Sequence, residues 1–121
     1  MMLGTNDLGN PTGVENRLRN LVSKITTLRP DTRLFVAKIT PASNYPAVSA
    51  AYNQQVTAIG AEFRAAGKNV HLGDLHTGFP ANGMGSDGLH PNHTAFLWMA
   101  QRWYDAILAS YPPVDPTGPP L

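Results

Sequence analysis

The sequence contains no cysteine among its 121 residues. A chain without cysteine has neither a disulfide framework nor thiolate chemistry, although this leaves its redox compartment open. Charged residues make up only 14% of the chain, the formal net charge is +1, and no basic stripe is concentrated anywhere. Because binding to a phosphate backbone needs clustered positive charge, we expect no nucleic acid partner.

Long apolar runs are also absent. No stretch approaches the length that a membrane-spanning helix needs, so we expect no membrane partner. No signal peptide is visible at the N-terminus. The localisation therefore stays open, and secretion remains compatible with the sequence if an N-terminal part with a signal peptide is missing.

A metal site is the next candidate, because the chain has four histidines: His71, His76, His90 and His93. No set of cysteines or carboxylates completes a recognisable ligand spacing around them. We therefore predict no metal and no cofactor, with His71 at a strand end and His76 in a loop.

Strand-like and helix-like segments alternate along the chain. Short apolar runs predict strands, and apolar residues at a helical period predict helices. The strands are expected at residues 1–3, 33–40 and 69–72, and the helices at 14–28, 47–66 and 92–110. This βαβαβα order predicts one α/β domain with a parallel sheet, right-handed crossovers and helices on its faces.

Several local patterns predict where the helices begin and end and which of their side chains face inward. Thr12 and Glu15 fit a capping box for the first helix, and Gly67 suits the C-terminal end of the second. On the second helix Asn53 is expected to face either the site or solvent, and we favour solvent. On the last helix we expect these apolar residues to face inward: Phe96, Met99, Ala100, Trp103 and Ile107.

The loop of residues 73–89 is long for a compact domain and ends in Asp87-Gly88-Leu89-His90-Pro91. Loops of this length are usually functional or mobile. An acid three residues ahead of a histidine can orient that histidine as the base of a nucleophilic site. Pro91 suits the first position of a helix, which would place His90 at the start of the last helix. Asp87 and His90 are therefore the candidate catalytic pair.

A second candidate stretch, Gly4-Thr5-Asn6-Asp7, follows the apolar residues 1–3. A turn at the carboxyl end of a strand can present the amide of Asn6 as a donor to an oxyanion. Ligands of open α/β sheets bind outside the carboxyl ends of the strands, so the two stretches are expected to be neighbours. Asp7 is expected to brace its own turn.

Together, the two stretches resemble the third and fifth sequence blocks of the SGNH (GDSL-type) hydrolases, which are small esterases. Residues 35–41, Phe-Val-Ala-Lys-Ile-Thr-Pro, resemble the middle strand of the secreted branch that includes acetyl xylan esterases. The resemblance covers most of residues 1–110. It implies a three-layer αβα sandwich with a flavodoxin-like sheet and an ester substrate with a small acyl group or an acetylated carbohydrate. It also implies Asn6 as oxyanion-hole donor, His90 as base and Asp87 as its orienter.

The chain departs from this family at the nucleophile. The family's serine lies in a Gly-Asp-Ser block near its N-terminus, and no such block is present here. Ser86 lies beside Asp87 but reads Gly-Ser-Asp, and no helix follows it directly, so we do not favour it as a nucleophile. We expect a domain at residues 1–110 that lacks the family's N-terminal strands, followed by a Pro-rich tail or linker at residues 111–121.

Two hypotheses follow from the missing serine. The first is an ester hydrolase whose nucleophile lies outside this sequence. The second is a non-catalytic remnant that acts as an assembly or binding module. In either case the apolar strand at Met1–Leu3 would be an open edge, where a second copy or a complementing chain could pair.

Four further residues have a simple structural interpretation that we favour. Asn92 opens a helix, so we expect it to cap that helix rather than to carry a glycan. Asp74 follows a strand and is expected to be a turn acid. Trp98 and Trp103 are expected to pack rather than to form a sugar platform.

Overall fold

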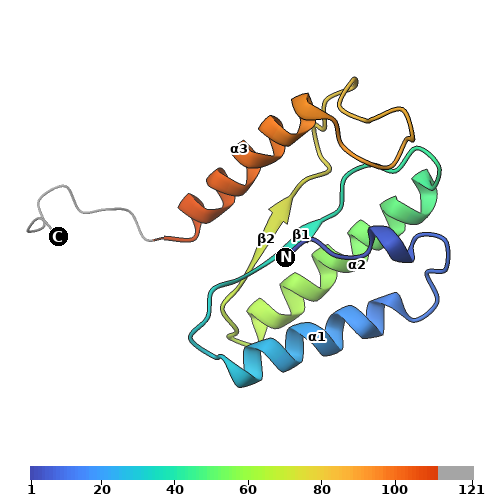
Figure 1. Ribbon diagram of the computed structural model, residues 1–121. Helices are drawn as coiled ribbons and strands as arrows, with labels where there is room; N and C mark the ends of the chain where they lie inside the picture. The colour runs from blue at the N-terminus through green and yellow to red at the C-terminus, as the bar shows by residue number, and fades with distance from the viewer. Residues whose placement is uncertain (112–121) are drawn as a thin grey trace, which may run out of the picture.

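The computed structural model describes residues 1–111 of the chain (Figure 1). The predicted βαβαβα order is confirmed, although a single bridge at Met2 takes the place of the first strand. In chain order the elements are the short 3-10 helix η1 (Thr5–Asp7), α1 (Val14–Leu28), β1 (Leu34–Lys38), α2 (Pro46–Ala65), β2 (Val70–Asp74) and α3 (His93–Ala109).

The sheet is parallel, with β1 between Met2 and β2. Strands β1 and β2 pair in a register that runs from Leu34 opposite Val70 to Lys38 opposite Asp74. On the other side of β1, Met2 pairs with Ala37, whose backbone N–H donates to the carbonyl of Met1 over 2.9 Å. The carboxyl end of β1 therefore lies between the turn after Met2 and the loop after β2.

Helices cover the two faces of the sheet in separate layers. Helices α1 and α2 pack against each other on one face, and α3 lies on the other, as Figure 1 shows. Successive residues of β1 pack into opposite layers. Val36 belongs to the core beneath α1 and α2. Ala37 is buried on the α3 side, beside Gly73 and Trp103. This explains the nearly continuous apolar run of β1, because a strand covered on both faces has no solvent-facing side.

The start of α1 differs from the sequence prediction. The N-cap is Gly13 with φ of 72°, no side chain caps the helix, and Glu15 pairs with Arg19 over 2.8 Å. The capping box that we predicted for Thr12 and Glu15 is therefore wrong. The prediction for the end of α2 is better, since Gly67 lies one residue beyond the C-cap with φ of 74°, and its N–H donates to Arg64.

Asn53 is also corrected, because it is only 4% exposed rather than facing solvent. Its side-chain oxygen accepts from the N–H of Ile39 over 2.8 Å, and its amide donates to the carbonyl of the same residue over 3.0 Å. Ile39 follows the last residue of β1, where sheet pairing has stopped. The side chain of Asn53 thus replaces a missing neighbouring strand and fixes the direction in which the chain leaves β1.

Helix α3 begins two residues later than the Pro91 pattern predicts. Asn92 is the N-cap and accepts from the N–H of Ala95 over 3.2 Å, which confirms its capping role. Pro91 forms a bridge with Met84 instead of opening the helix. The inward face is also rotated from the predicted one, since Phe96 and Ile107 are 56% and 41% exposed. The inward positions are Ala95, Met99, Trp103 and Ala106.

Two remaining predictions concern the ends of the chain and the membrane. Of the Pro-rich tail predicted at residues 111–121, all but Tyr111 lies outside the described residues. None of the helices that the structure describes combines the length and the hydropathy that crossing a membrane requires.

Candidate functional site

Asp87 and His90 lie in direct contact at the end of the loop that precedes α3. Oδ2 of Asp87 lies 2.6 Å from Nδ1 of His90, while Oδ1 accepts from the N–H groups of Leu89 at 3.0 Å and of His90 at 2.9 Å. The backbone N–H of His90, its side chain and the N–H of Leu89 together hold the pKa of Asp87 well below its usual value. Asp87 is thus ionised near neutral pH.

An ionised carboxylate can only accept a hydrogen bond, so Nδ1 of His90 must carry the proton of that contact. In the neutral imidazole this leaves the lone pair on Nε2, which makes no hydrogen bond within residues 1–111. The side chain of His90 is 76% exposed. The pair can therefore accept a proton at Nε2 from a group that approaches from solvent.

The loop after β1 supports the turn that holds this pair. The N–H of Ser43 donates to the carbonyl of Gly88 over 2.8 Å, and the side-chain amide of Asn44 donates to the carbonyl of Asp87 over 3.1 Å. Gly88 has φ of 67°, and a Cβ there would lie 3.1 Å from Cβ of Ser43. The positive φ strains any other residue at this position, and a Cβ would make a tight contact with Ser43, so both features favour glycine.

The turn of Asn6 is held by side chains from the first two helices. Gly4 has φ of 115°, and a Cβ there would lie 2.3 Å from the ring of Tyr52, whose hydroxyl donates to the carbonyl of Leu3 over 2.6 Å. Asp7 pairs with Arg17 over 2.7 Å, which confirms that it braces its turn. The side chain of Asn6 is exposed and makes no hydrogen bond within residues 1–111.

An open cavity of about 300 Å³ lies beside this turn and is lined by residues 2–7, including Asn6. His90 and Asp87 do not line it. The structure therefore brings Asp87 and His90 together, and it places Asn6 on a separate turn at the carboxyl end of the neighbouring Met2 segment. A substrate carbonyl would have to lie between the two turns for all three residues to act on it.

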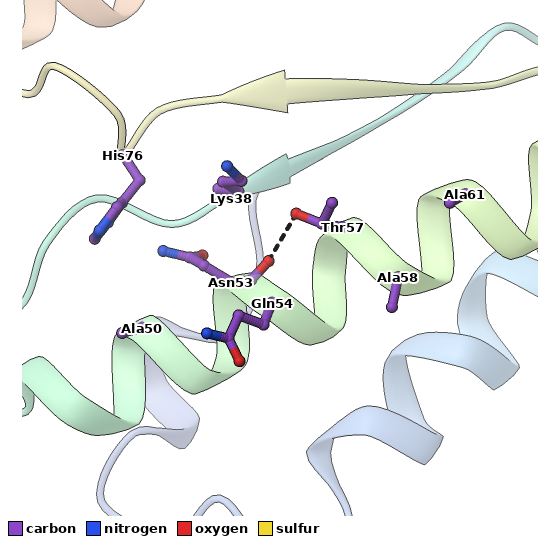
Figure 2. Close-up of a pocket in the computed structure, with 8 residues that line it drawn as sticks. All are labelled: Lys38, Ala50, Asn53, Gln54, Thr57, Ala58, Ala61 and His76. Atoms are coloured by element: carbon purple, nitrogen blue, oxygen red, sulfur yellow. Dashed lines mark hydrogen bonds between the residues drawn. The ribbon is translucent and has the colours of Figure 1, made fainter.

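A larger open pocket of about 500 Å³ was not predicted from the sequence. It lies between α2 and the carboxyl ends of the strands, and Figure 2 shows its polar side chains, which include Lys38, Gln54, Thr57 and His76. Nδ1 of His76 is buried without a hydrogen-bond partner. The charged residue Lys38, at the end of an apolar strand, was the sequence feature that could have indicated it.

Asp74 stabilises the loop on the strand side of this pocket. Its carboxylate accepts from the backbone N–H groups of His76 and Thr77 at 3.0 and 2.9 Å, from the Thr77 hydroxyl at 2.8 Å and from Lys38 at 2.9 Å. Burial alone would raise the pKa of Asp74, but these hydrogen bonds outweigh it and lower the pKa well below its usual value. Asp74 is therefore a turn acid, as predicted.

Within residues 1–111, no group of three or more His, Asp or Glu side chains has the arrangement to hold a metal ion. The two tryptophans pack as expected: Trp98 contacts Phe79 edge to face at 5.6 Å, and the ring of Trp103 covers Gly73.

The parallel sheet between helical layers resembles the fold of SGNH-type hydrolases. Residues 1–95 match the GDSL-like lipase/acylhydrolase family, and the chain belongs to that family. The family resemblance of the sequence is thereby confirmed.

Solved structures support the same fold. A family 3 carbohydrate esterase from Clostridium thermocellum is 31% identical, with a TM-score of 0.75 over 89% of this chain and 54% of its own. A carbohydrate esterase family 3 structure from Talaromyces cellulolyticus is 23% identical, with a TM-score of 0.79 over 89% of this chain and 55% of its own. The chain thus spans about half the length of these proteins. No curated protein matches it.

Proposed function

We propose that this chain supplies the acid–base part of an ester-hydrolase site. His90 is the general base, Asp87 orients it, and Asn6 donates a hydrogen bond to the oxyanion. The observation that carries the proposal is the 2.6 Å contact of Asp87 Oδ2 with His90 Nδ1, which leaves Nε2 free and exposed. The nucleophilic serine comes from outside this sequence, since the chain lacks a Gly-Asp-Ser block.

The reaction follows the serine-hydrolase sequence. Nε2 of His90 takes the proton of the serine hydroxyl as its oxygen attacks the ester carbonyl. The amide of Asn6 donates to the oxygen on which negative charge develops. His90 then gives the proton to the leaving alcohol, and in the second half it activates the water that releases the acid from the acyl-enzyme. Asp87 stays ionised throughout and stabilises the imidazolium.

The proposed substrate is an acetylated carbohydrate, with plant polysaccharides as the candidate source. Residues 35–41 resemble the corresponding strand of acetyl xylan esterases, and the 31% identical Clostridium thermocellum protein is a carbohydrate esterase. Residues 1–110 form the hydrolase-like domain of this proposed enzyme, and serine-hydrolase chemistry needs no cofactor.

The experiment is intact-mass spectrometry of the native preparation after exposure to a fluorophosphonate, with acetyl ester hydrolysis measured in parallel. An adduct on a co-purifying polypeptide, lost when His90→Ala replaces the wild-type chain, supports the proposal. An adduct on this chain itself would overturn the external origin of the serine. Ser43→Ala and Ser86→Ala then identify which serine reacts, because Ser43 contacts the Asp87–His90 turn and Ser86 lies in it.

The second candidate is a non-catalytic remnant that acts as an assembly or binding module. It is favoured by one observation, the lack of a nucleophile block in a chain that spans about half of its solved relatives. Absence of any adduct, together with absence of ester hydrolysis in the native preparation, would support this function and overturn the first.

A further inference from the structure

The loop between β1 and α2 is held firmly at its base. Its residues Ile39, Thr40 and Ala42 are buried, with no more than 3% of each exposed. Asn53 binds both backbone groups of Ile39, at 2.8 and 3.0 Å. The last residues of the loop, 43–45, therefore project from a rigid support.

The turn of residues 85–90, which carries the candidate catalytic pair, closes mainly on itself. The N–H of Gly85 donates to the carbonyl of His90 over 2.7 Å, and the N–H of Gly88 donates to the carbonyl of Gly85 over 3.0 Å. The side chain of Leu89 packs against the core. Within residues 1–111, two hydrogen bonds join this turn to another segment, and both come from the loop after β1. These two bonds and the Leu89 contact therefore fix the place of the turn.

The two bonds hold the peptide groups on either side of Gly88. The side-chain amide of Asn44 donates to the carbonyl of Asp87 over 3.1 Å. The N–H of Ser43 donates to the carbonyl of Gly88 over 2.8 Å, and the N–H of the same peptide, that of Leu89, binds the Asp87 carboxylate. A glycine allows wide backbone rotation, so Gly88 cannot hold the two peptides by itself. The contacts from outside the turn supply that rigidity.

The loop after β1 also lies between the two candidate turns, since β1 lies between Met2 and β2. On the side of Met2, a Cβ at Gly9 would lie 3.7 Å from the hydroxyl oxygen of Tyr45. Residues 43–45 thus contact the turn of the base on one side and the segment after Asn6 on the other. A loop with both contacts sets the distance between the base and the oxyanion donor.

We infer that Asn44 is a positioning residue of the proposed site. Its amide holds the peptide of Asp87, which keeps the carboxylate in contact with His90 and keeps Nε2 of His90 at a fixed distance from the oxyanion donor. Asn44 acts through Asp87 and not on the reacting atoms. The inference rests on the proposed function, because it concerns the base of that reaction. A displacement of a catalytic group by about 1 Å can cost about a hundredfold in rate, so one polar contact outside the reacting atoms is enough to matter.

The first test measures the turn itself in the 121-residue chain. Asn44 is exposed, so Asn44→Ala removes the donor without disturbing the core. Amide NMR relaxation is expected to give order parameters of about 0.85 for residues 87–90 in the wild type and below about 0.6 in Asn44→Ala. Asn20→Ala is the control, at an exposed asparagine of α1 without a side-chain hydrogen bond in residues 1–111, and it should match the wild type. Unchanged order parameters in Asn44→Ala, or a turn that is already mobile in the wild type, would overturn the inference.

The second test is steady-state kinetics in a preparation that hydrolyses acetyl esters. Asn44→Ala is expected to lower kcat by about ten- to a hundredfold with KM unchanged, while the thermal midpoint shifts by only a few degrees. A lower midpoint with wild-type kcat would mean that Asn44 is merely structural, and the inference would be wrong.

His90→Ala, measured beside Asn44→Ala, separates this inference from the proposed function. If His90→Ala abolishes hydrolysis while Asn44→Ala keeps the wild-type kcat, the inference alone fails. If His90→Ala hydrolyses the ester like the wild type, the proposed function fails, and the inference fails with it.

Discussion

The hydroxyl of Tyr52 on α2 donates to the carbonyl of Leu3 over 2.6 Å, so one phenol connects a helix to the turn that carries Asn6. Its ring also occupies the space that a side chain at Gly4 would need. The positive φ of Gly4 turns the chain out of the sheet directly after Leu3, and Tyr52 holds it there. The position of Asn6 therefore depends on a residue that is 46 positions away in the sequence.

Removing this hydroxyl with Tyr52→Phe is expected to lower the free energy of unfolding by about 0.5–1.5 kcal/mol, the net value of one hydrogen bond. Urea unfolding followed by circular dichroism measures the change. Tyr45→Phe is the matched control, since the Tyr45 hydroxyl makes no hydrogen bond within residues 1–111 and its removal should change stability little. Equal effects of the two substitutions would contradict the role of the Leu3 contact.

Tyr52 should also make the protein sensitive to high pH. Burial, with a smaller effect of the Asp7 charge, raises the pKa of Tyr52 from 10.0 to about 12. The folded state thus favours the neutral phenol, and its contribution to stability is complete below pH 10. That contribution is lost as the pH rises from about 10 through about 12. Urea unfolding across this range should show the loss in the wild type and a smaller loss in Tyr52→Phe.

Asn53 is expected to be the more sensitive position on α2. Asn53→Ala would leave the N–H and the carbonyl of Ile39 buried without partners, which costs roughly 1–3 kcal/mol for each unsatisfied group. Gln54→Ala, at the exposed neighbouring position, should stay within about 0.5 kcal/mol of the wild type. A loss of similar size in both variants would argue against the Asn53–Ile39 contact.

Asp74 should contribute to the loss of stability in acid. Its folded-state pKa is depressed below the ordinary 3.8, so the stability that it provides is present above that value and is lost as the pH falls below it. The difference in unfolding free energy between the wild type and Asp74→Asn should therefore shrink from about pH 5 to about pH 2. Asp31→Asn, at an exposed acid without a hydrogen-bond partner in residues 1–111, is the control and should show a difference that varies little with pH.

The sequence predicts correctly those structural features that depend only on residues within one segment. The alternation of strands and helices and the cap at Asn92 both follow from local residues, and both are confirmed. The proximity of Asp87 to His90 also follows from their spacing, because an Asp in a turn readily accepts from backbone groups two and three residues later.

The predictions from sequence are wrong where a contact with residues distant in the sequence determines which side chains are buried. An asparagine on a helix is usually exposed, and only the position of Ile39 shows why Asn53 is buried. Helix α3 is apolar on both sides, so its periodicity alone cannot predict which side faces the sheet. The pocket at Lys38 and His76 depends on the path of two loops, which no local pattern encodes.

The proposed pair can be tested most directly with Asp87→Asn in a preparation that hydrolyses acetyl esters. The asparagine oxygen can still accept from the N–H groups of Leu89 and His90, so the turn should keep its shape. The side-chain NH₂, however, would donate to Nδ1 of His90, which moves the imidazole proton to Nε2 and removes the base.

We therefore expect kcat to fall by about ten-thousandfold, the loss seen when a catalytic histidine is held in the wrong tautomer. Asn6→Ala should lower kcat by about a hundredfold or more through loss of the oxyanion donor, whereas Asn10→Ala, in the same loop, should have little effect. Steady-state kinetics with an acetyl ester separates these changes from changes in KM, which should be small because both interactions strengthen in the transition state. An unchanged kcat in Asp87→Asn would show that the contact with His90 is structural, since the substitution alters the position of the proton while preserving the turn.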